Sequence, residues 1–387
     1  MEDIIVIGGG PAGVTAALRA RELGASTALV ERQRLGGTCT NDGCVPTRVL
    51  ARAARLVRDA EQFGEFGLEA ELPKVNFARL LSKTQQVVYS IHEKKQLINT
   101  LRDAGVGLYL GVGEARFVDP HTIALADGTQ LQAKKFILCA GGHARRLSFP
   151  GAELALTHSD IWSLKKLPKS VAMVGASATG SQVASILNAF GTQVTLVDVN
   201  PRILAMEDES VSRAIQHAFQ KRGIQILMGI GGIDRIEQLE RSLRLFYKTN
   251  DGLQSLDAEA VIMATGWPGN AESLNLQAAG VKSERGYIMV DDFLRSTAEH
   301  IFAAGDITGR MMLVQSASYD ARIAVENAVL GPGQHYKHQI VPHGGFTDPE
   351  YGSVGLTEAQ ARAQNDIVVG EAQYLDLDRA VVDGRTE

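Results

Sequence analysis

Cysteine is scarce in this sequence, because the 387 residues contain only three, Cys39, Cys44 and Cys139. So small and odd a number excludes the disulfide framework of a small secreted protein. The sequence also lacks an apolar run of about 18 residues, the length that crosses a membrane as a helix, and it lacks a basic leader. We therefore expect a soluble, cytoplasmic protein.

An excess of charge of one sign is also missing. The 39 basic and 44 acidic residues give a formal net charge of −5, and no run of lysine and arginine stands out. These features give no support to a nucleic-acid or membrane partner. Proline is rare, at 11 residues, whereas glycine is abundant, at 40. In a chain of two or three domains, so much glycine suggests tight turns and close backbone approach to ligands.

A glycine-rich turn near the start joins a buried strand to a helix. Residues 3–7 are mostly apolar, six turn residues follow, the helical pattern runs to Gly24, and a second apolar run ends at Glu31. Glycine here allows a tight turn and close approach of a pyrophosphate to a helix N-terminus, while the acid accepts hydrogen bonds from ribose hydroxyls. The pattern predicts dinucleotide binding by Gly8, Gly10, Pro11, Ala12, Gly13 and Glu31.

The same layout returns 167 residues later. An apolar run over 171–174 precedes a second turn, and the run over 194–197 ends at an acid. One such turn alone is weak evidence, but a complete second copy at a constant offset is difficult to attribute to chance. The sequence therefore predicts a second dinucleotide site, which uses Gly175, Ser177, Gly180 and Asp198.

Cys39 and Cys44 are five positions apart, in a segment that begins with Gly36 and ends with Pro46. Neither a regular helix nor a strand brings positions i and i+5 within disulfide distance, so we expect a distorted turn between them. Proline fits the first turn of a following helix, whose N-terminus favours a thiolate. Two buried apolar cysteines are the alternative, and Cys139 fits it better than the pair does.

The segment Gly37-Thr38-Cys39-x-Asn41-x-Gly43-Cys44-x-Pro46 resembles the signature of class I pyridine nucleotide–disulfide oxidoreductases, a family that includes dihydrolipoyl dehydrogenase, glutathione reductase and mercuric reductase. The resemblance implies an α/β fold with two nested Rossmann-like domains, which bind FAD and NAD(P)H, and a C-terminal α+β dimerisation domain. It implies FAD-binding domain segments at 1–150 and 273–335, an NAD(P)-binding domain at 151–272, and a partial dimerisation domain at 336–387.

The resemblance also assigns roles to residues. Electrons would pass from NAD(P)H through FAD to a redox-active Cys39–Cys44 disulfide, with Cys44 facing the flavin and Cys39 exchanging with the acceptor. Asp198 favours NAD(H) over NADP(H), although Arg202 nearby could partly compensate. Strands that end in glycine would complete each nucleotide site. The further cofactor contacts implied are Gly37, Thr38, Arg48, Ala115, Gly141, Gly266, Asp306 and Val314.

Several positions depart from the family pattern. Arg48 and Gln182 replace a lysine and a glutamate that form an ion pair beside the flavin, so the local charge rises and a reduced, anionic flavin is favoured. Ordinary polar replacement is the alternative. Ser177 replaces the middle glycine of the second turn, and Trp267 stands where arginine is common.

The C-terminal region leads to the remaining expectations. Only part of the family's dimerisation domain, residues 336–387, is present, so we expect a monomer or a weak homodimer. The family's His-Glu acid–base pair does not occur before Glu387, which favours an acceptor that needs no proton shuttle at the disulfide. His335 and His338 are more typical of a surface loop than of a metal site, and we expect no bound metal. The acceptor would be a disulfide or a metal ion. The alternatives are a diaphorase-type quinone or dye reductase, a non-catalytic flavin-binding redox sensor, or a truncated fragment.

Overall fold

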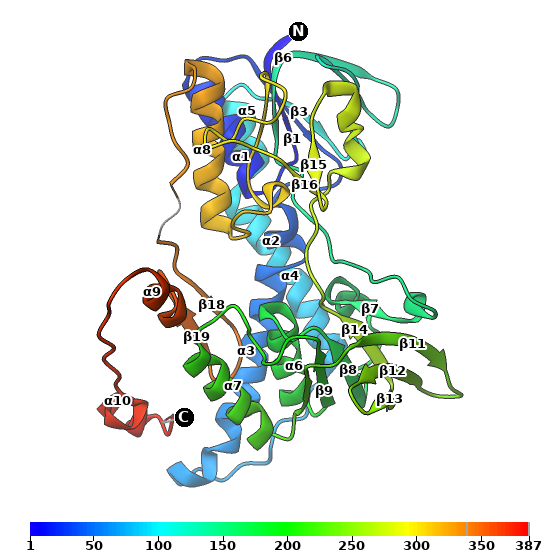
Figure 1. The fold of residues 1–387 in the computed structure, drawn as a ribbon, viewed down its shortest axis with the longest axis vertical. Helices are drawn as coiled ribbons and strands as arrows, with labels where there is room; N and C mark the ends of the chain where they lie inside the picture. The colour runs from blue at the N-terminus through cyan, green and yellow to red at the C-terminus, as the bar shows by residue number, and fades with distance from the viewer. Residues whose placement is uncertain (338–339, 386–387) are drawn as a thin grey trace. The chain divides into compact units, whose positions relative to one another are not determined.

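The computed structural model describes residues 1–337 and 340–385, which divide into two compact units. Unit 1 comprises 1–46, 85–143 and 267–337, and unit 2 comprises 47–84, 144–266 and 340–385. Each unit is therefore assembled from three separate stretches of the chain, as the colours of Figure 1 show.

Unit 1 is built on a parallel sheet of five strands in the order β3 (Gly107–Leu110), β2 (Thr27–Glu31), β1 (Glu2–Ile7), β6 (Gln130–Leu138) and β17 (Ile301–Ala303). The first half of β6 also pairs antiparallel with β5 (Thr122–Ala124), and β5 pairs with β4 (Arg116–Asp119). Residues 4–7 of β1 are all buried, which explains their continuous apolar run, because both faces of a parallel sheet are covered.

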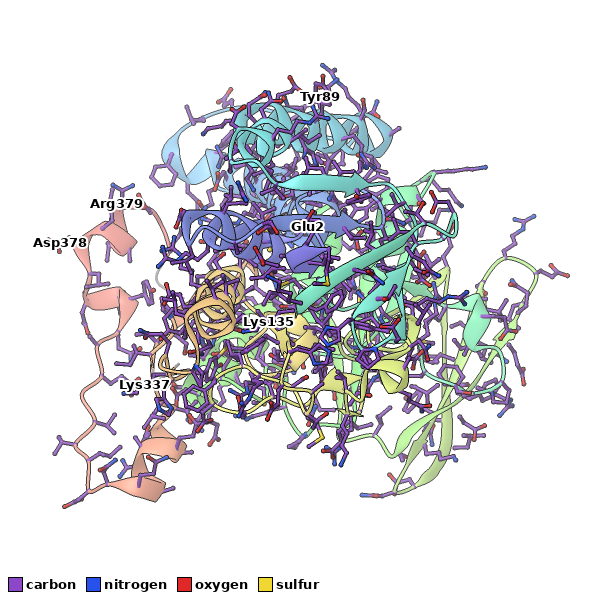
Figure 2. All side chains as sticks on the ribbon, turned by 90° about the horizontal axis from the view of Figure 1, so that it is seen from above. Glu2, Tyr89, Lys135, Lys337, Asp378 and Arg379 are labelled. Carbon is purple, nitrogen blue, oxygen red and sulfur yellow. The ribbon has the colours of Figure 1, made fainter. Side chains whose placement is uncertain are left out.

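Helix α1 (Pro11–Glu22) packs on α8 (Val314–Leu330), and both contribute to one core cluster of unit 1. Lys135 of β6, labelled in Figure 2, donates its Nζ proton to the carbonyl oxygen of Ala328 in the last turn of α8. The sheet and these helices hold the carboxyl ends of β1 and β2 in fixed positions.

Unit 2 repeats this design with a parallel sheet in the order β10 (Gln225–Met228), β9 (Gln193–Asp198), β8 (Ser170–Val174), β14 (Ala260–Met263) and β7 (Leu156–Thr157). Helices α6 (Ala178–Ala189) and α7 (Glu209–Lys221) pack on it. A separate antiparallel sheet contains β11 (Gly232–Gln238), β12 (Leu243–Thr249) and β13 (Gly252–Ala258).

The other helices connect or flank these layers. They are α2 (Gly37–Asn41), α3 (Cys44–Glu61), α4 (Phe77–Lys95) and α5 (Leu97–Asp103). A single helix over 83–102 fits the sequence pattern, but Gln96 adopts φ +47° and separates α4 from α5. None of the helices in the described ranges is long and apolar enough to cross a membrane.

The C-terminal stretch of unit 2 forms the hairpin of β18 (His343–Gly345) and β19 (Tyr351–Ser353), followed by α9 (Glu358–Gln364) and α10 (Asp378–Val382). Asp348 forms ion pairs with Arg222 and Arg58, and its N–H donates to Ser185 Oγ. His343 Nε2 contacts the buried carboxylate of Glu207 at 3.1 Å.

Short elements complete the structure. A two-stranded pair consists of β15 (Ser283–Glu284) and β16 (Tyr287–Ile288). Short 3₁₀ turns cover Phe63–Phe66, Ala152–Leu154, His158–Ser163, Glu272–Leu274, Leu276–Ala279, Asp306–Thr308 and Tyr374–Asp376.

Candidate active site

The first glycine turn leaves no room for a side chain at Gly8 or Gly13. Gly8 adopts φ +106°, and a Cβ there would lie 2.2 Å from the carbonyl oxygen of Cys139. A Cβ on Gly13 would lie 1.7 Å from the carbonyl oxygen of Gly8. Pro11 occupies the first turn of α1, where a missing N–H costs nothing, and Gly10 is its N-cap. The N-terminus of α1 is thus open to a phosphate.

Glu31, at the end of β2, is buried and bound by backbone on both oxygens. Its Oε2 accepts from the N–H of Gly9 at 2.7 Å, and its Oε1 accepts from the N–H of Gln33 at 2.7 Å. These two bonds fix the carboxylate beside the glycine turn, as a ribose contact requires.

The second turn reproduces the first almost atom for atom. Gly175 also adopts φ +106°, and its Cβ would lie 2.3 Å from the carbonyl oxygen of Ala264. Asp198 Oδ2 accepts from the N–H of Ala176 at 2.6 Å, as Glu31 does from Gly9. Gly180 has the same close packing as Gly13, since its Cβ would lie 1.8 Å from the Gly175 carbonyl oxygen.

The serine in the second turn causes no local strain. Gly10 and Ser177 share the same N-cap backbone angles, φ −75° and ψ −173°. A Cβ on Gly10 would meet its nearest atom only at 3.7 Å. This position of the turn therefore accepts a side chain in both copies, and Ser177 is exposed.

Two residues near Asp198 make contacts that the sequence did not predict. Asn200, which stands 167 residues after Gln33, donates from both its backbone N–H and its Nδ2 to Asp198 Oδ1, at 2.8 and 2.9 Å. Arg202 instead donates to backbone carbonyl oxygens of the following loop, those of Leu204, Ala205 and Glu207. The constant offset could have revealed Asn200.

The cysteine segment packs directly against the first glycine turn. The N–H of Gly36 donates to the carbonyl oxygen of Gly9 at 2.8 Å. Gly37 adopts φ +56°, and a Cβ there would lie 2.7 Å from Gly10 Cα, so only glycine fits. The residues that carry Cys39 are thus fixed beside the loop that would bind the FAD pyrophosphate.

The two cysteines lie on two different helices, which are separated by Asp42 and Gly43. Cys39 lies in α2, the carbonyl oxygen of Thr38 accepts from the N–H groups of Asp42 and Gly43, and Cys44 begins α3. Both cysteines are half-buried. By contrast, burial raises the pKa of the Cys139 thiol, in keeping with a structural role.

The sequence analysis did not predict the polar contacts between α2 and α4. Asn41 Nδ2 donates to the carbonyl oxygens of Leu35 and Gly37, both at 3.0 Å, and Asn41 Oδ1 lies 2.8 Å from His92 Nε2. Lys95 Nζ donates to Thr40 Oγ1 at 3.3 Å. His92 and Lys95 belong to no sequence motif, and only the tertiary structure shows that α4 lies beside α2.

Asp306 has an indole as its hydrogen-bond partner. Trp267 Nε1 donates to Asp306 Oδ2 at 3.1 Å, and a Cβ on Gly142 would lie 2.5 Å from that same nitrogen. Burial raises the pKa of Asp306, while the bond from Trp267 lowers it. The resemblance also implied contacts from Ala115, Gly141, Gly266 and Val314. Ala115 is buried just before β4, Gly141 and Gly266 have positive φ, and Val314 begins α8.

Arg48 and Gln182 both contact Phe346, a residue that the sequence analysis did not select. The guanidinium carbon of Arg48 lies 4.9 Å from the centroid of the Phe346 ring. Gln182 Oε1 accepts from the N–H of Phe346 at 3.1 Å. Their shared neighbour comes from the C-terminal stretch of the chain.

Within residues 1–337 and 340–385 no group of three or more histidine, cysteine or acidic side chains could hold a metal ion. His335 stacks on Phe293 with ring centroids 4.5 Å apart, whereas His338 lies outside the described residues.

The fold and the paired turns define an α/β protein with two dinucleotide-type glycine turns, and comparison with known proteins gives the family. Residues 2–321 match the pyridine nucleotide-disulphide oxidoreductase family, and residues 341–387 match the dimerisation domain of the same family. The chain belongs to this family, whose members include flavin-dependent disulfide oxidoreductases.

Individual relatives agree with this assignment. The chain is 33% identical to a mercuric reductase of Bacillus cereus, over 99% of this chain and 61% of the relative, so that it spans less than two thirds of that protein. It is 31% identical to a dihydrolipoyl dehydrogenase of Bacillus subtilis (strain 168), over 100% of this chain and 84% of the relative. A solved structure, the HOCl-induced flavoprotein disulfide reductase RclA from Escherichia coli, superposes with a TM-score of 0.86 at 27% identity, covering 99% and 84% of the two chains.

Proposed function

We propose that this protein is an FAD-dependent enzyme that passes electrons from NADH to a Cys39–Cys44 disulfide and from there to an external acceptor. The observation that carries the proposal is the packing of the cysteine segment on the first glycine turn, through Gly36 and Gly37. This packing supports a redox pair next to an FAD site, as does membership of a family of flavin-dependent disulfide oxidoreductases.

The residues of unit 1 fit FAD. The open N-terminus of α1 suits the pyrophosphate, Glu31 suits a ribose, and Asp306 offers a carboxylate oxygen to a flavin side-chain hydroxyl. When bound, FAD would accept an electron pair from the nicotinamide and deliver it to a disulfide. We accordingly propose FAD-binding segments at 1–150 and 273–335, with NAD(P) binding at 151–272.

The two cysteines have different surroundings, which support different roles. Cys44 begins α3, and a helix N-terminus stabilises a thiolate, so this sulfur would be the one held next to the flavin. Cys39 would attack the acceptor disulfide and release one thiol. Cys44 would then displace the second thiol and re-form the Cys39–Cys44 bond.

The second nucleotide site favours NADH over NADPH. Asp198 is held by the N–H groups of Ala176 and Asn200, which leaves a fixed negative charge where a 2′-phosphate would lie. Arg202, the nearby cation that could offset this charge, donates to three carbonyl oxygens. These contacts argue against the sequence-based expectation that Arg202 partly offsets the charge of Asp198.

Arg48 and Gln182 would favour the reduced, anionic flavin, because no acid balances the arginine at the position of the family's ion pair. Their shared contact with Phe346 supports a fixed placement for both. We propose that residues 341–387, which match a dimerisation domain, join two copies of the chain. Exposed apolar side chains on this stretch, among them Val354, Leu356 and Val382, suit such an interface.

The acceptor is proposed to be a disulfide or a metal ion, on the strength of relatives named as mercuric reductase and dihydrolipoyl dehydrogenase. The test is anaerobic titration of the purified flavoprotein with NADH, followed by addition of lipoamide, mercuric ion or a quinone. We expect NADH to bleach the flavin, and we expect Cys39→Ser and Cys44→Ser to abolish turnover with lipoamide while Cys139→Ser retains it. Quinone reduction that survives both cysteine substitutions, with no activity on lipoamide or mercuric ion, would replace this proposal with a diaphorase.

A further inference from the structure

The short helix that carries Cys39 is held from one side by α4. His92 and Lys95 lie three residues apart near the end of α4 and contact Asn41 and Thr40, the two residues that follow Cys39. Thr40 is buried and Asn41 is half-buried. The contact therefore acts on the segment that contains the proposed exchange sulfur.

The hydrogen bonds of Asn41 define the orientation of its amide. Because Nδ2 donates to two carbonyl oxygens, of Leu35 and Gly37, the other amide atom that faces His92 is the oxygen. An amide oxygen only accepts, so His92 Nε2 must carry the proton in this bond. The hydrogen bond thus determines that Nε2 of the imidazole is protonated, and it also fixes the position of the ring.

The charge state of His92 follows from its neighbours. Burial lowers the pKa of His92, and the nearby cations Arg34, in the loop before α2, and Lys95, on α4, lower it further. The imidazole is therefore neutral near pH 7, with the proton on Nε2 and an unprotonated Nδ1.

The backbone at this point has little freedom to replace a lost contact. Gly36 adopts φ +94°, and its Cβ would lie 2.9 Å from the side chain of Thr40 and 3.3 Å from His92 Cε1. The imidazole thus packs over the turn as well as bonding to it. Without the His92 N–H donor, Asn41 Oδ1 loses this hydrogen bond, and the turn that carries Cys39 becomes more mobile.

We propose that His92 is a positioning residue for the redox cysteines, which, as its Nε2–H tautomer, holds Asn41 and with it the turn that carries Cys39. The inference rests on the proposed role of Cys39 and Cys44. A disulfide requires Cα atoms within about 4.4–6.8 Å, so a contact that holds the turn in the geometry of the disulfide favours the disulfide over the dithiol. His92 therefore makes the Cys39–Cys44 disulfide harder to reduce.

The test measures the dithiol–disulfide equilibrium in the FAD-loaded protein. Wild type, His92→Phe and His92→Gln are equilibrated with dithiothreitol buffers, quenched in acid and alkylated, and the peptides with Cys39 and Cys44 are quantified by mass spectrometry. Phenylalanine keeps the ring packing but has no donor, whereas the glutamine amide restores one. We expect His92→Phe to shift the equilibrium roughly three- to tenfold towards the dithiol, tenfold being about 30 mV, and His92→Gln to stay within about twofold of wild type.

Equal equilibria for wild type and His92→Phe, or an equal shift in both variants, would overturn the inference. If His92→Phe does not retain FAD, nitrogen NMR of the wild-type imidazoles decides, with the His92 signal assigned by its loss in His92→Gln. A proton on Nε2 at neutral pH supports the inference, and a proton on Nδ1 alone refutes it. A wild-type protein that forms no Cys39–Cys44 disulfide would instead refute the proposed function.

Discussion

At the scale of single residues, the two acids at the ends of β2 and β9 show how a carboxylate can be both buried and available. Glu31 and Asp198 each accept backbone N–H groups from the adjoining glycine turn and from a residue two positions further on. These bonds offset the cost of burial and fix the orientation of the carboxylate. A ribose with two free hydroxyls suits such a site, and a phosphate does not.

Replacing Asp198 with alanine should therefore change the nucleotide preference. We expect wild type to prefer NADH roughly 10- to 150-fold in kcat/KM, and Asp198→Ala to narrow the gap mainly by admitting NADPH. Stopped-flow flavin reduction with both nucleotides measures the ratio, and Asp251→Ala, at an exposed acid in the turn between β12 and β13, serves as the control. A wild-type preference for NADPH would contradict the assignment.

Replacing Trp267 with phenylalanine should change how FAD binding depends on pH. The bond from Trp267 favours the Asp306 carboxylate, so its loss raises a pKa that burial has already raised. The anionic form is lost as the pH falls through that value. We thus expect Trp267→Phe to release FAD at a higher pH than wild type does, with affinities within about threefold at pH about 8. Flavin fluorescence during acid titration measures this, and Trp162→Phe is the control.

At the scale of elements, the β–α turns of the two units share their backbone angles and close packing, and we expect substitutions in one turn to leave the other unaffected. A methyl group on Gly8 or Gly175 would strain a left-handed backbone and collide with a carbonyl oxygen at 2.2 or 2.3 Å. Such strain costs on the order of 1–3 kcal/mol. Each turn belongs to a different compact unit, so damage to one leaves the other turn intact.

Gly8→Ala should consequently lower the FAD content of the purified protein, whereas Gly175→Ala should retain FAD but raise the concentration of NADH needed to reduce it, roughly tenfold or more. Visible absorbance and an NADH titration measure the two effects. Gly64→Ala, where an added Cβ meets no atom within 4 Å, should behave as wild type. Loss of both cofactors in either variant would show that the turns are not independent.

At the scale of the whole molecule, polar contacts join the C-terminal stretch to the rest of unit 2. Asp348 is largely buried and pairs with two arginines, Arg58 and Arg222. Removing one partner of such a group leaves charge that is not compensated, at a cost of about 3–5 kcal/mol for a fully buried pair and less for a partly exposed one.

Asp348→Ala should therefore release residues 340–385 from the rest of unit 2 before the remainder of the protein unfolds. We expect faster tryptic cleavage in this stretch with the FAD absorbance unchanged, and a shift from dimer to monomer in sedimentation velocity. Glu350→Ala, which removes only the more exposed ion pair with Arg55, is the matched control. An unchanged cleavage rate in Asp348→Ala would show that apolar packing alone holds the stretch.

The sequence alone determined the features that depend on local backbone rules. Glycines with positive φ, an acid at the end of a strand, a constant offset of 167 residues and the Cys39–Cys44 signature predict the family, the fold class and the two glycine turns, because each rule acts within a few residues of chain. Only the tertiary structure decided the partners of those features. His92 meets Asn41 across 51 positions, Phe346 meets Gln182 across 164, and Arg202 donates to carbonyl oxygens of the following loop. Contacts between distant segments depend on how helices pack, and no local pattern encodes that.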